Sequence, residues 1–478
     1  MRSNRALKSA QEWARHEFGS AQLGSQARTH RLIKIAAAAA SRPAGRLTEV
    51  LTDPAAREGA YRFMENEQVD PNAITHGLGV GCAERCRNES FVFVPVDGSS
   101  LTLPDPHQVR GLGAVGSDCY GQHGLQAMTA IAVTADGTAA GLLGQRLWAR
   151  QRKAKAKGKA KAKAKTKHRR RRRLHEKETR YWLDVINDSC RCWEQAGAQG
   201  RLWFQLDRGG DFWEMLQWAE SQRHHWVTVR VAYDRRVALD GGDYLWPFMQ
   251  RQPVLGHYEL EVPSGQHRQA RRARFEVRAA PVTVWARARP SKKKIPIALG
   301  AVWAKEVSPV PPGEKPLQWM LFTTAPLNTF ADAQQVIFGY TRRWRIEEFH
   351  RTWKSTCRVE ETQLRGATRV HRWAVILAAV ATRIQRLTQL ARTAPEMPAA
   401  QELTSDEIDA VLLLRKPALY KAQKSPTIEQ AVRWIAELGG YTGKSSGGPP
   451  GATTLSRGLL QIQAVAKALR NQRESSDE

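Results

Sequence analysis

Two short apolar runs, each followed by an aspartate, constrain this chain more than any other feature. Residues 91–96 lead into Asp97, and residues 202–206 lead into Asp207. Apolar runs of this length are typical of buried strands. Helical and strand-like segments separate the two runs, which predicts a mixed α/β domain. Carboxylates at the ends of such strands lie at one edge of a sheet, where ligands commonly bind.

A third acid lies far downstream, in a segment that we predict to be one long helix over residues 331–357. Tyr340, Arg343, Glu347 and Lys354 follow one another at intervals of three, four and seven residues. These intervals place all four side chains on one helical face. A solvated, salt-bridged helix would explain Arg and Glu on this face, but it would not explain the tyrosine.

Three converging carboxylates would repel one another unless cations lie between them. Mg²⁺ prefers carboxylate oxygens, and two such ions can activate a water molecule and stabilise the leaving oxygen of a phosphodiester. Each acid alone is commonly a turn or cap residue. The combination predicts metal-dependent phosphoryl transfer.

The charge of the chain indicates a polyanionic partner. Lys and Arg number 74 and Asp and Glu 46, so the net charge is +28. This surplus favours nucleic acid over an anionic membrane. Residues 152–173 form a low-complexity insertion with fourteen basic residues and no acid. No apolar run is long enough to span a membrane, and the beginning of the chain does not resemble a secretion signal.

We expect three domains. Residues 1–70 form a helical DNA-binding domain, 71–366 a catalytic domain with a β insertion at 235–318, and 367–478 a helical dimerisation domain. The first carries basic side chains that would hold a duplex or would simply be solvated. The last has a heptad-like apolar stripe that would pair two subunits or pack on its own chain. The DNA-binding candidates are Arg28, Arg31, Lys34 and Arg62, and the stripe comprises Leu455, Leu459, Ile462, Ala466 and Leu469.

The chain resembles the bacterial cut-and-paste transposases that include the transposase of transposon five. The family signature Y-x2-R-x3-E-x6-K is met within YTRRWRIEEFHRTWK, which contains Tyr340, Arg343, Glu347 and Lys354. VDGSSL and LDRGGD supply the two aspartates, and PLQWMLFT precedes the signature helix. LGSQARTHRLIKIAAAAA and EGAYRFMEN resemble the DNA-binding domain of the family, and LGGYTGK near the end of the chain is also similar.

The resemblance implies a ribonuclease-H-like mixed sheet flanked by helices. It also implies a DDE triad of Asp97, Asp207 and Glu347 that binds two Mg²⁺ ions, for which Mn²⁺ can substitute. The implied reaction nicks the transposon end, forms and opens a hairpin, and joins the 3′-OH to target DNA. Trp319 or Trp344 would stack a flipped base or belong to the core, while Tyr340, Arg343, Lys354 and Arg230 would hold phosphates.

Further expectations concern partners and location. The resemblance implies a homodimer that bridges two terminal inverted repeats, in a bacterial cytoplasm and associated with the nucleoid. Two other functions remain open: a structure-specific DNA endonuclease on the same core, and a noncatalytic DNA-binding regulator. Cys82, Cys86, Cys190 and Cys192 leave structural zinc as an alternative to free thiols, although no pair has the usual CxxC spacing.

Overall fold

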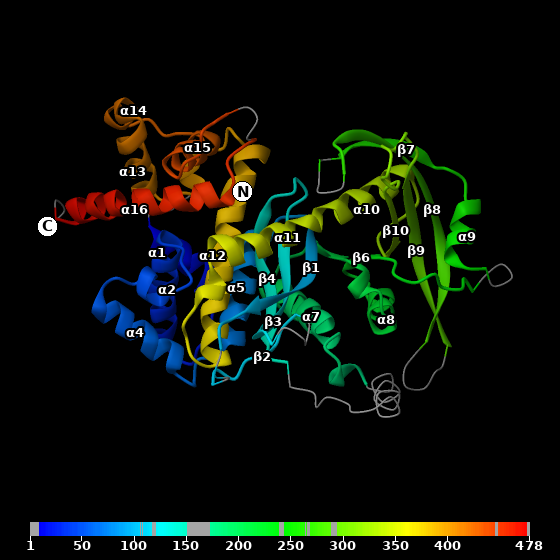
Figure 1. Cartoon of the computed structure of the whole chain (residues 1–478), viewed down its shortest axis with the longest axis horizontal. Coiled ribbons are helices and arrows are strands. Elements are labelled where there is room, and N and C mark those ends of the chain that lie inside the picture. The colour runs from blue at the N-terminus through cyan, green and yellow to red at the C-terminus, as the bar shows by residue number, and fades with distance from the viewer. Residues whose placement is uncertain are drawn as a thin grey trace.

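One mixed sheet of ten strands runs through the computed structural model of the chain, with helices on both of its faces (Figure 1). The structure describes residues 9–475 except 106, 108, 117–120, 151–172, 239–242, 263, 265–267, 288–293 and 445–447. The predicted basic run at 152–173 therefore lies outside the described residues, apart from Arg173.

The first part of the sheet has the strand order β4-β3-β1-β5-β6. β1 pairs antiparallel with β3 and parallel with β5, and β5 pairs parallel with β6. Three antiparallel strands followed by two parallel ones form a ribonuclease-H-like sheet, so the predicted fold class is confirmed. The strands are β1 (Phe91–Thr102), β3 (His123–Val133), β4 (Ala139–Trp148), β5 (Arg201–Leu206) and β6 (Trp226–Arg230), and the short β2 (Gly113–Ala114) pairs with β3.

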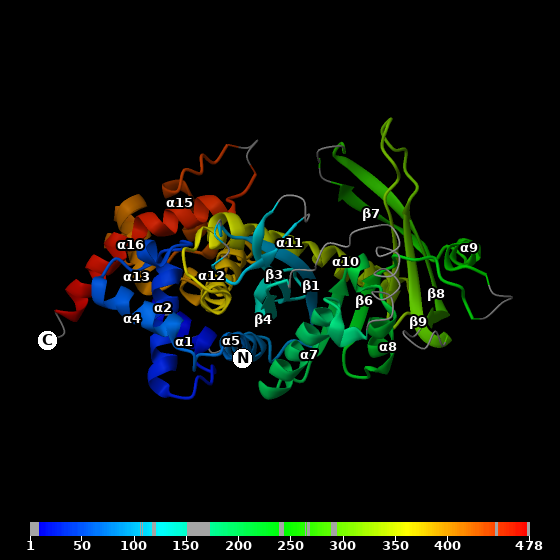
Figure 2. The same ribbon diagram turned by 60° about the horizontal axis from the view of Figure 1, so that its bottom comes forward.

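The segment between β6 and the signature helix extends this same sheet. Its strands are β7 (Gly256–Val262), β8 (Arg271–Arg287) and β9 (Lys294–Glu306), and β9 pairs with β10 (Gln318–Thr323), which pairs with β6. The predicted β insertion thus also contains a short helix, α9 (Leu245–Arg251). β7 to β9 and α9 lie at the end of the molecule opposite the terminal helices (Figures 1 and 2).

Helices from the two ends of the chain pack together at the other end of the molecule. The N-terminal group contains α1 (Ala10–Phe18), α2 (Gln26–Ser41), α3 (Leu47–Val50), α4 (Pro54–Glu65) and α5 (Pro71–Arg85). Ser9, Ser25, Asp53 and Asp70 cap four of them by accepting backbone N–H groups, which satisfies donors that would otherwise lack partners. Residues 1–70, which were predicted to be helical, contain α1 to α4, and α5 follows them.

The C-terminal helices are organised around α12 (Ala367–Thr393), whose residues 370–390 are all buried. A helix that is buried on every side is a core helix. Around it lie α13 (Ser405–Arg415), α14 (Pro417–Lys421), α15 (Ile428–Leu438) and α16 (Ala452–Glu474). α12 contacts α2, α4 and α5 as well as α15 and α16, so it joins the two terminal groups.

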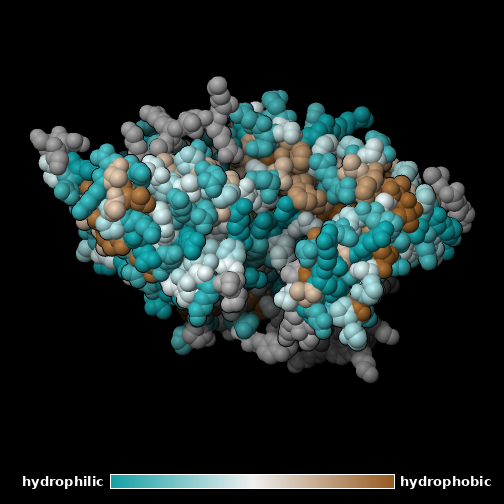
Figure 3. Space-filling model, turned by 90° about the horizontal axis from the view of Figure 1, so that it is seen from above, coloured by the Kyte–Doolittle hydropathy of each residue, from teal (hydrophilic) through white to brown (hydrophobic). Residues whose placement is uncertain are grey.

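The remaining helices pack on the two faces of the sheet. α7 (Arg180–Gln195) and α8 (Trp213–Ser221) contribute to one buried cluster, while α10 (Phe330–Arg342) and α11 (Trp344–Arg351) contribute to the other. The surface seen in Figure 3 is mostly hydrophilic, with separate hydrophobic patches. None of the described helices meets the length and hydropathy needed to cross a bilayer.

Candidate active site

Two of the three predicted acids come from neighbouring parallel strands. Side chains alternate between the faces of a sheet, and Phe93 and Trp203 face the cluster that includes α10 and α11. Asp97 and Asp207 each follow four residues later, so the alternation places both on that same face. Burial is the main cause of the raised pKa of Asp97, and the charge of Asp207 adds to it.

Asp97 does not end its strand, contrary to the sequence prediction. β1 continues to Thr102 because β3 pairs with it beyond this point, and Asp97 itself pairs with Thr129. The parallel partner β5, however, stops at Leu206, opposite Val96. Asp97 therefore lies where the edge of the parallel sheet opens, and Asp207 is the first residue after β5.

The helix that carries Glu347 is interrupted, also contrary to the prediction of one continuous helix. Arg343 separates α10 from α11, where the Arg343 N–H donates to Tyr340 O at 3.1 Å and the Ile346 N–H donates to Arg343 O at 3.1 Å. These three-residue hydrogen bonds tighten the chain locally. A π-helical turn, Thr352–Thr356, follows α11 and carries Lys354. The regular spacing of the signature is therefore not a regular helical face over its whole length.

Arg343 bridges the two acids that come from different parts of the chain. Its Nη1 donates to Asp97 Oδ2 at 3.1 Å, and its Nη2 donates to Glu347 Oε1 at 2.6 Å. The guanidinium is largely buried, with 11% of the side chain exposed. Burial, followed by the charge of Asp207, raises the pKa of Asp97 to about 6, although Arg343 acts in the opposite direction. The structure thus brings Asp97, Arg343 and Glu347 into direct contact.

The donor set suits a hard divalent cation. Asp97, Asp207 and Glu347 offer carboxylate oxygens only, and these are the ligands that Mg²⁺ and Mn²⁺ prefer. Their accumulated negative charge already binds one cationic group, Arg343. Among the described residues, no three acidic, histidine or cysteine side chains are arranged so that they could hold a metal ion. The three carboxylates therefore have the right chemistry for Mg²⁺ or Mn²⁺. In this structure the Arg343 guanidinium binds two of them, Asp97 and Glu347.

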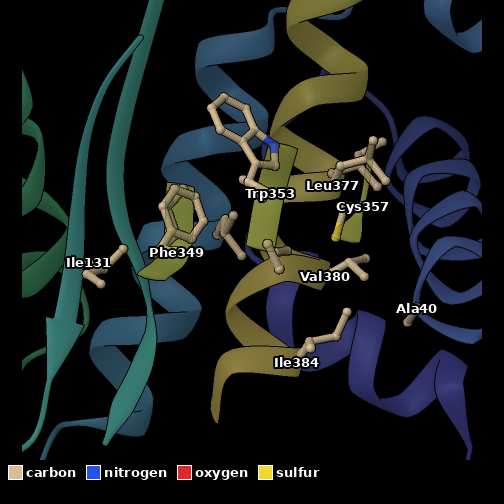
Figure 4. Close-up of a cluster of buried hydrophobic side chains, with 14 of the residues drawn as sticks. Ala40, Ile131, Phe349, Trp353, Cys357, Leu377, Val380 and Ile384 are labelled. Atoms are coloured by element: carbon tan, nitrogen blue, oxygen red, sulfur yellow. The ribbon is translucent and has the colours of Figure 1, made fainter. Parts of the chain in front are cut away.

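The hydrophobic core fixes the helix behind Glu347. Figure 4 shows Phe349 of α11 and Trp353 of the π turn beside Leu377, Val380 and Ile384 of α12. The rings of Phe349 and Trp353 stack at 5.8 Å, and Trp353 Nε1 donates to Ala374 O at 3.0 Å. Phe349 and Trp353 therefore anchor this segment in the core, while Glu347, two residues before Phe349, lies on another side of α11 and meets Arg343.

The predicted DNA-contacting aromatic residues have different environments. Trp319 on β10 is half-buried and stacks on Phe275, with ring centroids 5.4 Å apart. Trp344 is 58% exposed and lies 5.8 Å from the Arg343 guanidinium. Tyr340 is only 6% exposed, so its ring belongs mainly to the core beneath Arg343. One face of Trp319 is thus occupied by protein.

The two predicted phosphate-binding cations near the site, Arg230 and Lys354, are both half-buried. Arg230 is half-buried at the end of β6 and donates from Nη2 to Gln318 O at 3.4 Å, beside Trp319. Lys354 is half-buried on the π turn. With burial as the main cause, the charge of Lys354 helps to lower the pKa of His350 to about 3. Their contact with phosphate stays a prediction.

The basic residues of the N-terminal helices divide into two groups. Arg28 is held within the domain, since Nη1 donates to Leu23 O at 2.8 Å and Nη2 bonds to Gln68. Arg31 and Lys34 are exposed on α2, and Arg62 is exposed on α4 beside Glu58. The exposed members can meet a duplex directly, whereas Arg28 shapes the loop before α2.

The apolar stripe of α16 packs within its own chain. Leu455, Leu459 and Ile462 are buried and belong to the main core, and Leu469 packs against it. These residues are therefore not available to a second subunit in this conformation, which favours the alternative reading of the stripe. The opposite side of α16 exposes Leu460, Ala464 and Ala468, at intervals of four.

A polar network beside the triad was not anticipated from the sequence. Glu348 accepts two bonds from Arg345 Nη1, at 3.0 and 2.9 Å, and one from Gln389 Nε2 of α12 at 3.1 Å. Arg345 Nε also donates to Gly137 O, in the turn between β3 and β4, at 3.0 Å. In the sequence, only the adjacent pair Glu347 and Glu348 hinted at a second functional acid, and this pair gave no indication of partners on α12.

Other candidate sites lie apart from the triad. A cavity of about 470 Å³ lies between α1 and α2 and includes Arg15, Gln22 and His30 in its lining, but none of the triad residues. The four cysteines considered for zinc have free thiols, on α5 or directly after it and on α7.

Three family comparisons cover most of the chain. Residues 10–69 match the transposase DNA-binding family, residues 121–383 the transposase DDE domain, and residues 379–478 the transposase Tn5 dimerisation domain. The DDE match includes Asp207 and Glu347 but begins after Asp97. It spans more than half of the chain, and the order of the three matches agrees with the helical, α/β and helical parts of the fold. The chain therefore belongs to the Tn5-type DDE transposases.

Proposed function

We propose that this transposase excises a DNA element by hairpin chemistry at its terminal inverted repeats and inserts it into target DNA. Asp97, Asp207 and Glu347 form its catalytic triad. The observation that carries this proposal is the joint contact of Arg343 with Asp97 and Glu347, because it brings the distant third acid to the edge where Asp97 and Asp207 lie.

The triad would hold two Mg²⁺ ions, or Mn²⁺ ions in their place. Bound there, the cations would supply activation of the attacking oxygen and stabilisation of the leaving oxygen. The protein holds the carboxylates in place through β1, β5 and α11. It needs no covalent intermediate, since water or a DNA 3′-OH is the nucleophile at every step.

Side chains around the triad would hold the distorted end of the DNA. The exposed ring of Trp344 and the half-buried ring of Trp319 would stack an unpaired base, and such stacking contributes about 1–3 kcal/mol. That energy is comparable with the cost of unstacking a base. Arg230 and Lys354 would hold adjacent phosphates. Tyr340 would act from beneath, through its contact with the Arg343 guanidinium.

Homodimer formation, which the C-terminal domain supports, would bring two transposon ends together. The exposed side of α16, with Leu460 and Ala464, is a surface that would be available for this contact. The exposed basic residues of α2 and α4 would bind each terminal repeat.

The decisive experiment compares the wild type with Asp97→Asn, Asp207→Asn and Glu347→Gln. Substrates carry the inverted repeats that flank the gene, and nicked, hairpin and joined products are resolved separately. We expect each variant to bind the DNA but to lose every product by more than about 100-fold, since even loss of a group that only supports a metal ligand costs 10–100-fold. Cleavage by the wild type without joining would instead indicate a structure-specific endonuclease, and binding without either reaction a regulator.

A further inference from the structure

Arg343 combines three features that a phosphate-binding side chain alone would not require. Its two terminal nitrogens donate to two different carboxylates, Asp97 and Glu347. It lies at the interruption between α10 and α11. It is also largely buried, and the ring centroids of Tyr340 and Trp344 lie 6.0 and 5.8 Å from its guanidinium carbon.

The carboxylate oxygens that Arg343 binds belong to the proposed metal ligands. A cation bound between Asp97 and Glu347 would meet the guanidinium charge at close range. An arginine side chain stays protonated under all ordinary conditions, so it cannot relieve this repulsion by losing a proton. Metal binding and the present position of Arg343 therefore oppose each other.

We propose that Arg343 is the resident counter-cation of the triad in the DNA-free enzyme and competes with divalent metal for Asp97 and Glu347. This inference rests on the proposed function, since it takes the three acids to be metal ligands. Arg343 offsets part of the negative charge of the acidic cluster until DNA arrives. A DNA phosphate then offers the guanidinium another bidentate anion, which arginine binds well.

The consequence is a linkage between DNA and metal. If DNA draws Arg343 away from the carboxylates, DNA binding must raise the affinity for metal, and metal must raise the affinity for DNA by the same factor. The chain thereby limits metal loading when no DNA is bound.

The test measures Mn²⁺ binding to the DNA-free full-length chain, by the electron paramagnetic resonance signal of free Mn²⁺. The variants are Arg343→Gln, which keeps length and polarity without charge, and Arg343→Ala. A neighbouring guanidinium changes the proton affinity of a carboxylate by roughly 10- to 1000-fold. We therefore expect Mn²⁺ to bind both variants at least about tenfold more tightly than the wild type, while DNA cleavage falls.

Arg351→Ala is the charge-matched control. Arg351 is exposed on the same helix, so its removal tests whether any lost positive charge would suffice. Unchanged Mn²⁺ affinity in this control, with tighter binding in both Arg343 variants, supports competition. Equal or weaker binding in a folded Arg343→Gln protein overturns it, and a circular dichroism melt establishes that the variant is folded.

Adding a duplex with the terminal repeat completes the test. We expect the duplex to tighten Mn²⁺ binding to the wild type and to have a much smaller effect on Arg343→Gln; an equal effect on both would overturn the transfer of Arg343 to phosphate. Failure of this inference is distinguishable from failure of the proposed function. If Asp97→Asn and Glu347→Gln abolish cleavage but Arg343→Gln does not tighten Mn²⁺ binding, only the inference fails; if those two variants still cleave DNA, the proposed triad fails.

Discussion

At the scale of single residues, the environment of a side chain decides what it can do. Arg28 and Lys34 look equivalent in the sequence, yet Arg28 bonds to Leu23 O and Gln68 while Lys34 is exposed. Tyr340 and Trp344 flank the same arginine, but only Trp344 presents a large free surface. Spacing along the chain identified these residues, whereas burial separates their roles.

His225 gives a prediction about pH at this scale. It is buried, and its Nδ1 accepts the Leu202 N–H at 3.2 Å. Burial, with further effects of His224 and Arg201, lowers its pKa to about 4, whereas an unfolded histidine titrates near pH 6.5. Between these values the unfolded chain binds more protons, so the folded state loses stability as the pH falls from about 6.5 to 4.

We expect this residue to contribute on the order of 1 kcal/mol to the loss of stability between pH 7 and pH 5. Urea denaturation at the two pH values measures the change. In His225→Gln, which can still accept the Leu202 N–H, the difference between the two midpoints should shrink. His371, whose pKa is also lowered to about 4, mainly by burial, leaves part of the pH dependence in place. Identical pH differences in wild type and variant would contradict the prediction.

At the scale of elements, the position of α11 depends on contacts on two sides. Phe349 and Trp353 pack it against α12, and Glu348 joins it to Gln389 of the same helix. Through Arg345, α11 is also bonded to the turn between β3 and β4. The direction of Glu347 is therefore set by α12 as much as by the sheet.

Glu348→Ala tests this dependence. The change leaves Arg345 and Gln389 without their common acceptor, and we expect DNA cleavage to fall by about 10–100-fold, as for other groups that orient metal ligands. Glu348→Gln retains an acceptor and should lose less. Binding of terminal-repeat DNA, measured by gel shift, should be unchanged, because the exposed basic residues of α2 and α4 are not altered.

Glu437→Ala is a suitable control for that experiment. Glu437 of α15 pairs with Arg415 of α13 and with Arg433 of its own helix. Partly exposed ion pairs of this kind contribute up to about 1 kcal/mol, so the control loses a comparable pair. Cleavage at the wild-type rate in Glu348→Ala, or an equal loss in the control, would show that Glu348 has no positioning role.

Much of the element order was predictable because the strands of the central sheet contain apolar runs bounded by turns. Residues 91–96 and 202–206 were predicted as strands and correspond to the first half of β1 and to β5. The continuation of β1 past Asp97 was not predictable, since it depends on pairing with β3. The interruption of the helix at Arg343 was not predictable either. Residues 340–347 contain neither Gly nor Pro, and the helical spacing of the signature continues across them.

At the scale of the whole molecule, α16 has two sides with different partners. Leu459 is buried against the C-terminal helices of its own chain, whereas the adjacent Leu460 is 45% exposed. Leu459→Ala should destabilise the isolated subunit by about 2–5 kcal/mol. Leu460→Ala should leave the melting temperature nearly unchanged but weaken dimer formation on DNA, measured by the mass of the complex. The reverse pattern would place the dimer contact on the buried stripe.

The helix α12 connects two parts of the enzyme. It belongs both to the part that matches the DDE domain and to the part that matches the dimerisation domain. Each added residue turns a helix by about 100° and lengthens it by about 1.5 Å. A single inserted or deleted residue in α12 would therefore rotate the residues on one side of the change by about 100° relative to those on the other side. We therefore expect changes in chain length to be tolerated in the surface loops but not within α12.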